Sequence, residues 1–137
     1  MEIKNKRIVI TGGKGFLGQK LQIALEKRDC KHILPLDCHD YDLTNIDDVN
    51  KMYDELKPEV VIHLAAVVGG IGANRRHPGK YFYDNLMMGV NLIEEARKFY
   101  TYACDRGWLK SCGNLGLMAL DEGGFSQAKA FFKPLCE

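Results

Sequence analysis

The stretch RIVITGGKGFLG, residues 7–18, places a short apolar run directly before three spaced glycines, Gly12, Gly15 and Gly18. Where a strand runs into a helix, such glycines permit a tight turn, close approach of the backbone to a ligand, and close packing of the helix on its strand. The helix that begins here also offers unpaired N–H groups and the positive end of its dipole. The stretch predicts a site for the pyrophosphate of a dinucleotide, although an ordinary glycine-rich turn has the same composition.

The rest of the first hundred residues alternates strand patterns with helix patterns. Apolar runs rich in β-branched residues alternate with segments whose apolar residues recur at helical spacing. The third apolar run shows little alternation, which fits a strand buried on both faces of a parallel sheet. The expected strands are 7–10, 32–36 and 59–66, and the expected helices are 15–28, 46–56 (capped by Thr44 or Asn45) and 78–99, with a flexible loop over 67–72.

This order predicts an α/β fold: a partial Rossmann fold of three parallel strands with helices, followed by a C-terminal α-helical hairpin. We expect the strands in the spatial order 3-2-1. That order leaves the backbone of residues 7–10 as an open sheet edge, to be covered by the hairpin or by another chain.

Asp37 ends the second expected strand, about 20 residues after Gly18, where dinucleotide-binding folds place an acidic group for the adenosine ribose hydroxyls. Because Asp40 and Asp42 follow closely, Asp37 is equally well explained as a turn residue at the end of a strand.

Five motifs together carry a family resemblance: TGGKGFLG (11–18), DYDLT (40–44), HLAA (63–66), GGIGAN (69–74) and NLMM (85–88). Over residues 6–99 the chain resembles the N-terminal part of the extended short-chain dehydrogenases/reductases, the NAD-dependent epimerase/dehydratase family. It is most similar to the GDP-L-fucose synthase branch, mainly through the GGIGAN loop.

The resemblance implies a cofactor site, with NAD or NADP as cofactor and a nucleotide sugar as a possible substrate. The fucose synthase branch looks like a group of NADP users, which carry a basic residue near the end of the second strand. This chain has Asp37 there, and its carboxylate would repel a ribose phosphate. The implied contacts are Gly12, Gly15, Phe16, Leu17 and Gly18 for the pyrophosphate, Asp42 and Leu43 for the adenine, Ala65 and Ala66 for the nicotinamide-side ribose, and Asn85 for the catalytic side.

After residue 99 the chain does not continue with the catalytic residues that this family would use. The family pattern continues with a serine and a Tyr-x-x-x-Lys pair, but none of the tyrosines at 81, 83, 100 and 102 has a lysine four positions later. Without such a lysine, no evident general acid or base remains for hydride chemistry. We therefore predict no catalytic residue, and leave open whether any catalysis survives.

Residues 100–137 resemble one Sel-one-like repeat, a relative of the tetratricopeptide repeat, although a generic amphipathic helix pair is the alternative. We thus expect two domains, a truncated Rossmann NAD(P)-binding domain over 1–99 and the repeat over 100–137. In disulfide-bearing members of that repeat family, cysteines spaced like Cys104 and Cys112 are linked, whereas two free thiols are the alternative in a reducing compartment. A single repeat cannot bury its own apolar face, which suggests a protein partner or self-association.

Composition bears on which partners and which compartment are expected. The formal net charge is +1 with dispersed charges, so neither nucleic acid nor an anionic membrane is expected as a partner. No apolar run has the length of a spanning helix, and the first residues lead straight into a strand, so a cytoplasmic setting without a signal peptide is expected. The cysteines and histidines lack metal-ligand spacing.

Two functions therefore remain for the chain: an NAD(P)-binding fragment, or an interaction module carried on a Rossmann half-domain. A joining of two unrelated pieces without a selected function is a third possibility.

Overall fold

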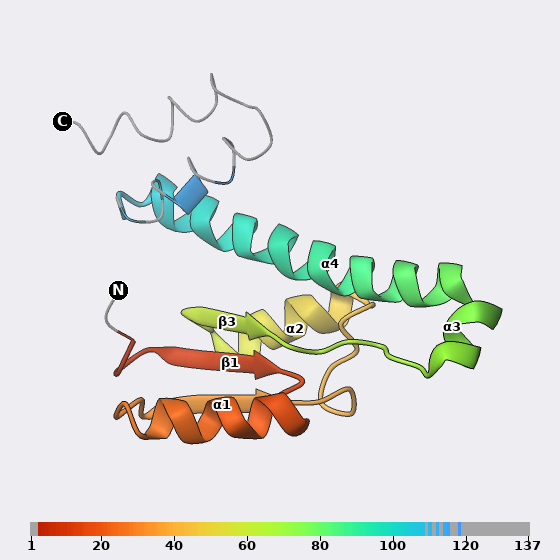
Figure 1. The fold of residues 1–137 in the computed structure, drawn as a ribbon. Coiled ribbons are helices and arrows are strands. Elements are labelled where there is room, and N and C mark those ends of the chain that lie inside the picture. Colours follow the sequence, from red (N-terminus) through yellow and green to blue (C-terminus); the bar gives the residue numbers. More distant parts are fainter. Residues whose placement is uncertain (1–2, 109, 111, 113, 116–117, 119–137) are drawn as a thin grey trace. The chain divides into compact units, whose positions relative to one another are not determined.

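The computed structural model describes residues 3–108 together with residues 110, 112, 114, 115 and 118. The chain divides into two compact units, Met1–Leu92 and Ile93–Glu137. The expected second helix of the C-terminal hairpin, around residues 128–133, lies outside the described residues. The elements are β1 (Arg7–Thr11), α1 (Phe16–Glu26), β2 (His32–Leu36), α2 (Ile46–Leu56), β3 (Val60–His63), α3 (Ile71–Arg76) and α4 (Pro78–Asp105) (Figure 1).

The three strands form a parallel sheet in the order β2-β1-β3, which confirms the partial Rossmann fold but shows that the predicted order 3-2-1 is wrong. β1 is central: Ile8 pairs with Ile33 of β2 and with Val60 of β3. The sequence carries a reason in Pro35, which has no N–H for a ladder and suits an edge strand such as β2. The open edge expected at residues 7–10 is therefore absent, because both sides of β1 are paired.

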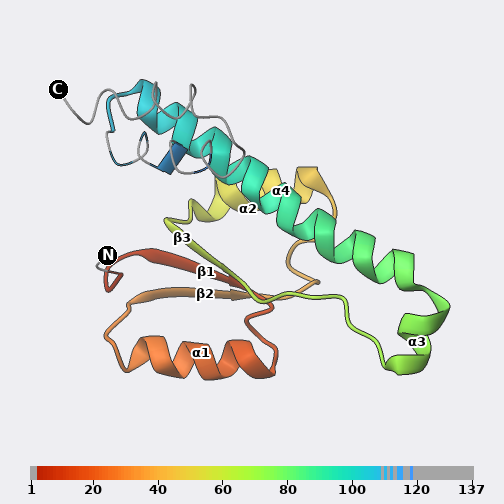
Figure 2. The ribbon, with the colours of Figure 1, turned by 45° about the horizontal axis from the view of Figure 1, so that its top comes forward.

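The central strand is also the most buried. Ile8, Val9 and Ile10 have no exposed surface. Ile8 and Ile10 pack with Leu25 of α1 on one face of the sheet, and α2 lies on the other side of the sheet in Figure 2. The residues of β3, expected to be buried on both faces, are only partly buried at 60–62, because among the described strands β3 pairs with β1 alone.

Local signals set the helix ends. Asn45 caps α2 by accepting a hydrogen bond from the Asp47 N–H (2.9 Å), and Lys57 ends it in the left-handed region. The short helix α3 replaces part of the expected loop, and Asn74 Nδ2 donates to the Gly69 carbonyl (2.6 Å) to hold its first turn. α4 continues past the predicted end at Phe99, since no glycine or proline occurs between Phe99 and Gly107.

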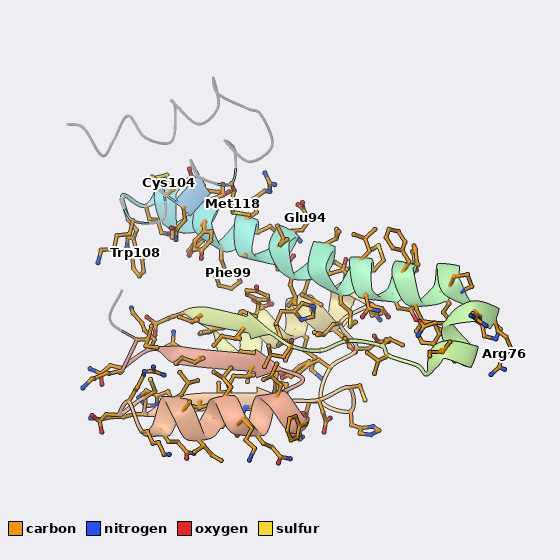
Figure 3. The ribbon with its side chains drawn as sticks, in the orientation of Figure 1. Arg76, Glu94, Phe99, Cys104, Trp108 and Met118 are labelled. Atoms are coloured by element: carbon orange, nitrogen blue, oxygen red, sulfur yellow. A yellow bond between two sulfur atoms is a disulfide. The ribbon has the colours of Figure 1, made fainter. Side chains whose placement is uncertain are left out.

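The second unit contains the last turns of α4 and a disulfide. Gly107, at φ +80°, ends the helix, and its N–H donates to the Cys104 carbonyl (2.9 Å). The structure joins Cys104 to Cys112, so the two thiols are not free. Cys104 and Trp108 are labelled in Figure 3. Among the described helices, none combines the length and the apolar character that crossing a bilayer would need.

Candidate functional site

A cavity of about 360 Å³ opens where the three strands of the sheet end. It brings together seven residues that the sequence had singled out, from three separate segments of the chain, together with eight that it had not. The predicted ones are Gly12, Gly15, Asp37, Asp42, Leu43, Ala65 and Ala66; the others are Thr11, Leu36, Cys38, Tyr41, Thr44, Leu64, Val67 and Met88.

The glycine loop forms the floor of this cavity. Gly12 has a φ of +68°, and a Cβ there would lie 2.7 Å from the Ala65 nitrogen, so only glycine fits. Gly15 is the N-cap of α1 and has an extended backbone. A Cβ at Gly15 would meet only the Gly12 carbonyl oxygen, at 3.2 Å, which leaves the first turn of α1 open for close approach by an anion.

Three other predicted pyrophosphate residues do not line the cavity. Gly18 is buried, and a Cβ there would lie 2.3 Å from the Gly13 carbonyl oxygen, so this glycine lets α1 pack on the loop. The side chains of Phe16 and Leu17 point outward, with 83% and 61% of their surface exposed. The glycines thus divide between ligand approach and helix packing, as the motif requires.

Lys14 joins the acidic group at the end of β2, and the sequence analysis missed it. Its ammonium lies 3.1 Å from Asp37 Oδ2 and 2.8 Å from Asp40 Oδ2. The pKa of Asp37 is lowered by the His39 N–H and by Lys14, and the pKa of Asp40 is lowered by Lys14 and by the Asp37 N–H. The same two carboxylates raise the pKa of Lys14. Both acids are therefore ionised and share a single cation.

The segment after β2 forms another wall and is held by its own side chains. The Asp42 carboxylate accepts the Thr44 hydroxyl (2.7 Å) and the Thr44 N–H (2.9 Å), which lower the pKa of Asp42. The Tyr41 hydroxyl donates to Glu55 Oε2 (2.6 Å), which raises the pKa of Tyr41 to about 12. Because the Asp42 carboxylate caps its own turn, the segment offers mainly its backbone and the buried Leu43 to a ligand.

A polar pair links the ends of β1 and β3 beneath the cavity. Thr11, almost fully buried, places its Oγ1 2.7 Å from Nδ1 of His63, and the Ala65 N–H donates to the same hydroxyl (3.4 Å). Burial lowers the pKa of His63, so the neutral imidazole is favoured. His63 thus joins the end of β3 to Thr11, whose hydroxyl also accepts the Ala65 N–H. The described residues contain no cluster of three or more metal-ligating side chains.

Asn85 does not line this cavity but a neighbouring one of about 700 Å³, and Val67 belongs to both. The Asn85 Oδ1 accepts the Val67 N–H (2.9 Å), and the Asn85 Nδ2 donates to the Val67 carbonyl (2.9 Å). Asn85 therefore holds the chain in place between the two cavities. Tyr81 also lines the second cavity, whereas Arg76 lies outside its lining, at the outer end of α3 (Figure 3).

Comparison with known proteins places this site in a family. Residues 8–106 match the NAD dependent epimerase/dehydratase family. A GDP-L-fucose synthase from Azorhizobium caulinodans is 33% identical, over 98% of this chain and 47% of the relative. Among solved structures, a GDP-mannoheptose C4 reductase from Campylobacter jejuni with NADP bound has a TM-score of 0.63 and 33% identity, over 70% of this chain and 30% of that one.

A Thermus thermophilus UDP-glucose 4-epimerase in complex with NAD has a TM-score of 0.60 and 27% identity, over 68% of this chain and 34% of that one. The chain spans less than half the length of these curated relatives and solved neighbours. The family match covers both the glycine loop and the segments that carry Asp37, Ala65 and Asn85. The chain belongs to the NAD dependent epimerase/dehydratase family.

Proposed function

We propose that this chain is the dinucleotide-binding part of a nucleotide-sugar epimerase or reductase that resembles GDP-L-fucose synthase. The observation that carries the proposal is the convergence of Gly12, Gly15, Asp37, Leu43 and Ala65 from three strand ends on one cavity. Parallel α/β sheets bind their ligands at this edge, outside the carboxyl ends of the strands.

Each wall has its own task in this proposal. The Gly15 backbone and the start of α1 hold the pyrophosphate, and Asp37 accepts hydrogen bonds from the adenosine ribose. Leu43 and its neighbours flank the adenine. Ala65 and Ala66 adjoin the nicotinamide-side ribose, so that the nicotinamide faces Val67 and the second cavity, where a nucleotide sugar would be held. The bound dinucleotide would supply hydride transfer.

The residues for proton transfer are not part of this proposal. Tyr81 and Tyr83 lack a lysine four positions later. Tyr53 has Lys57 at that spacing, but Tyr53 is only 4% exposed and its hydroxyl donates to the Leu92 carbonyl (3.0 Å). We therefore propose binding of NAD or NADP without catalysis by these 137 residues alone.

For residues 100–137 we propose, as a second function, a Sel-one-like repeat that contacts a protein partner. The Cys104–Cys112 disulfide supports this, because cysteines at this spacing are linked in the disulfide-bearing members of that repeat family. If a chain ending at residue 99 bound a partner peptide as strongly as the full chain does, residues 100–137 would not be the binding part, and this second proposal would be contradicted.

Calorimetric titration of NADH and NADPH into the purified chain and its Gly15→Val variant tests the main proposal. Valine should abolish binding, because its side chain occupies the space that the phosphates need. Gly70→Val is a matched control: Gly70 is the N-cap of α3, has a similar extended backbone, and would find no atom within 4 Å of its Cβ. Equal binding by wild type and Gly15→Val would overturn the site.

A further inference from the structure

Helix α4 holds two walls of the dinucleotide cavity through two asparagine side chains. Asn85 clamps Val67 on the nicotinamide side, with two hydrogen bonds of 2.9 Å. Asn91, further along α4, donates from Nδ2 to the Leu43 carbonyl on the adenine side (3.0 Å). Val67 and Leu43 both line the cavity, whereas Asn91 does not.

The bond from Asn91 is buried at both ends. Asn91 is 6% exposed and Leu43 is 7% exposed, so water does not replace the amide if it is removed. Other hydrogen bonds of this segment run to α2 and to the glycine loop: the Asp42 N–H donates to Asp48 (3.0 Å), the Tyr41 hydroxyl donates to Glu55 (2.6 Å), and Lys14 donates to Asp40 (2.8 Å). The bond from Asn91 joins the segment to α4.

Met88, which lies on α4 between the two asparagines, strengthens this picture. It is 6% exposed and lines the cavity itself. Leu43 and Met88 thus line the same cavity, one from the segment after β2 and the other from α4. A wall released from α4 would therefore change the part of the site nearest the adenine.

We propose that Asn91 is a positioning residue that holds the Leu43 wall for the adenosine half of the dinucleotide, while Asn85 holds the nicotinamide half. The proposal rests on the proposed function and assigns separate supports to its two halves. Asn91 touches no ligand in this scheme and acts only through the Leu43 backbone.

Replacing Asn91 with leucine keeps a similar volume but removes the donor. The Leu43 carbonyl is then buried without this partner, and the wall must shift toward water to recover a hydrogen bond. An adenosine ligand would have to order the wall again on binding, which weakens its affinity. The Val67 side stays clamped by Asn85.

The experiment measures the affinities of ADP, nicotinamide mononucleotide and NAD⁺ by calorimetry, with thermal melting of each variant. For Asn91→Leu we expect the affinity for ADP to fall about tenfold, as loss of one buried hydrogen bond implies. Nicotinamide mononucleotide should bind as in the wild type. Asn91→Gln keeps the donor and should restore most of the ADP affinity, whereas Asn85→Leu should weaken the mononucleotide instead.

Tyr53→Phe is the matched control. The Tyr53 hydroxyl donates to the Leu92 carbonyl (3.0 Å), so phenylalanine also removes a buried hydrogen bond to α4 but leaves Leu43 alone. It should lower the melting temperature without changing the affinity for ADP.

The outcomes separate the two proposals. Three results would overturn the role of Asn91: an unchanged ADP affinity in a folded Asn91→Leu, equal losses of affinity for ADP and for nicotinamide mononucleotide, or a matching loss of ADP affinity in Tyr53→Phe. In each case, NAD⁺ binding by the wild type would still support the proposed function. A wild type that binds none of the three ligands would overturn both. If Asn91→Leu does not fold, Asn91→Ala replaces it, because alanine adds no bulk.

Discussion

At the scale of single residues, the choice between the two dinucleotides depends on three charges. Lys14 bridges Asp37 and Asp40, and the three groups together carry one negative charge. A ribose hydroxyl can donate to Asp37 in this arrangement, whereas a 2′-phosphate would meet two carboxylates and a cation that is already paired. We therefore expect this chain to prefer NAD, although a similar solved structure, the GDP-mannoheptose C4 reductase, has NADP bound.

We predict that NADH binds more tightly than NADPH, and that Asp37→Asn combined with Asp40→Asn reverses part of this preference. The double change leaves Lys14 free to pair with the 2′-phosphate, so the ratio of the two dissociation constants should shift by about tenfold toward NADPH at low salt. Fluorescence titration of both reduced cofactors measures the ratio.

Asp29→Asn serves as its control, because Asp29 pairs with Lys4 (3.3 Å) and does not line the cavity. If the ratio of the NADH and NADPH dissociation constants shifts equally in the Asp37/Asp40 double variant and in Asp29→Asn, the shift is explained by net charge alone.

At the scale of elements, the strands assemble by rules that are only partly local. Predicted positions agree well for β2 and α2, whose apolar spacing and flanking turn residues are strong signals. The spatial order of the strands and the short helix α3 were harder to predict. Pro35 indicates an edge strand, but this signal was weaker than the usual strand order of the fold. α3 has only six residues, too few for periodicity to reveal.

The junction of β1 and β3 should make stability depend on pH. The pKa of His63 is lowered in the folded protein, so between that pKa and the ordinary value of 6.5 the unfolded chain binds more protons. Stability should therefore rise with pH through this window and level off above about pH 6.5. Urea unfolding at pH values from 5 to 8 should show a flatter profile for His63→Gln.

The matched variant is His32→Gln, which removes an exposed imidazole from β2. The carboxylates with lowered pKa values, such as Asp37 and Glu59, lose their contribution only at lower pH, as they become protonated. An identical slope in wild type and His63→Gln would show that His63 does not cause the dependence.

At the scale of the whole molecule, the chain spans less than half the length of its curated relatives and solved neighbours, and the residues named for its site are those proposed to bind a dinucleotide. We predict that this 137-residue chain does not reduce or epimerise a GDP-sugar at a measurable rate. Loss of general acid–base help alone typically slows a reaction by about 10²–10⁴-fold. Spectrophotometric assay of NADH and NADPH oxidation tests this.

Turnover abolished by Tyr81→Phe or Tyr83→Phe would contradict the prediction and identify a replacement acid. Tyr81 lines the second cavity, and Tyr83 is 60% exposed. Turnover that survives both changes would also contradict it, since it would require a group elsewhere.

The sequence by itself determined the family, the types of the strands and of the longer helices, and seven of the fifteen residues that line the cavity, because glycine spacing and apolar periodicity are local properties. Only the tertiary structure decided that β1 is central, that Lys14 lies between Asp37 and Asp40, and that Asn91 reaches Leu43. These features join residues far apart in the chain: 48 positions separate Asn91 from Leu43. Such pairings depend on how the strands order and the helices pack, which no local pattern encodes.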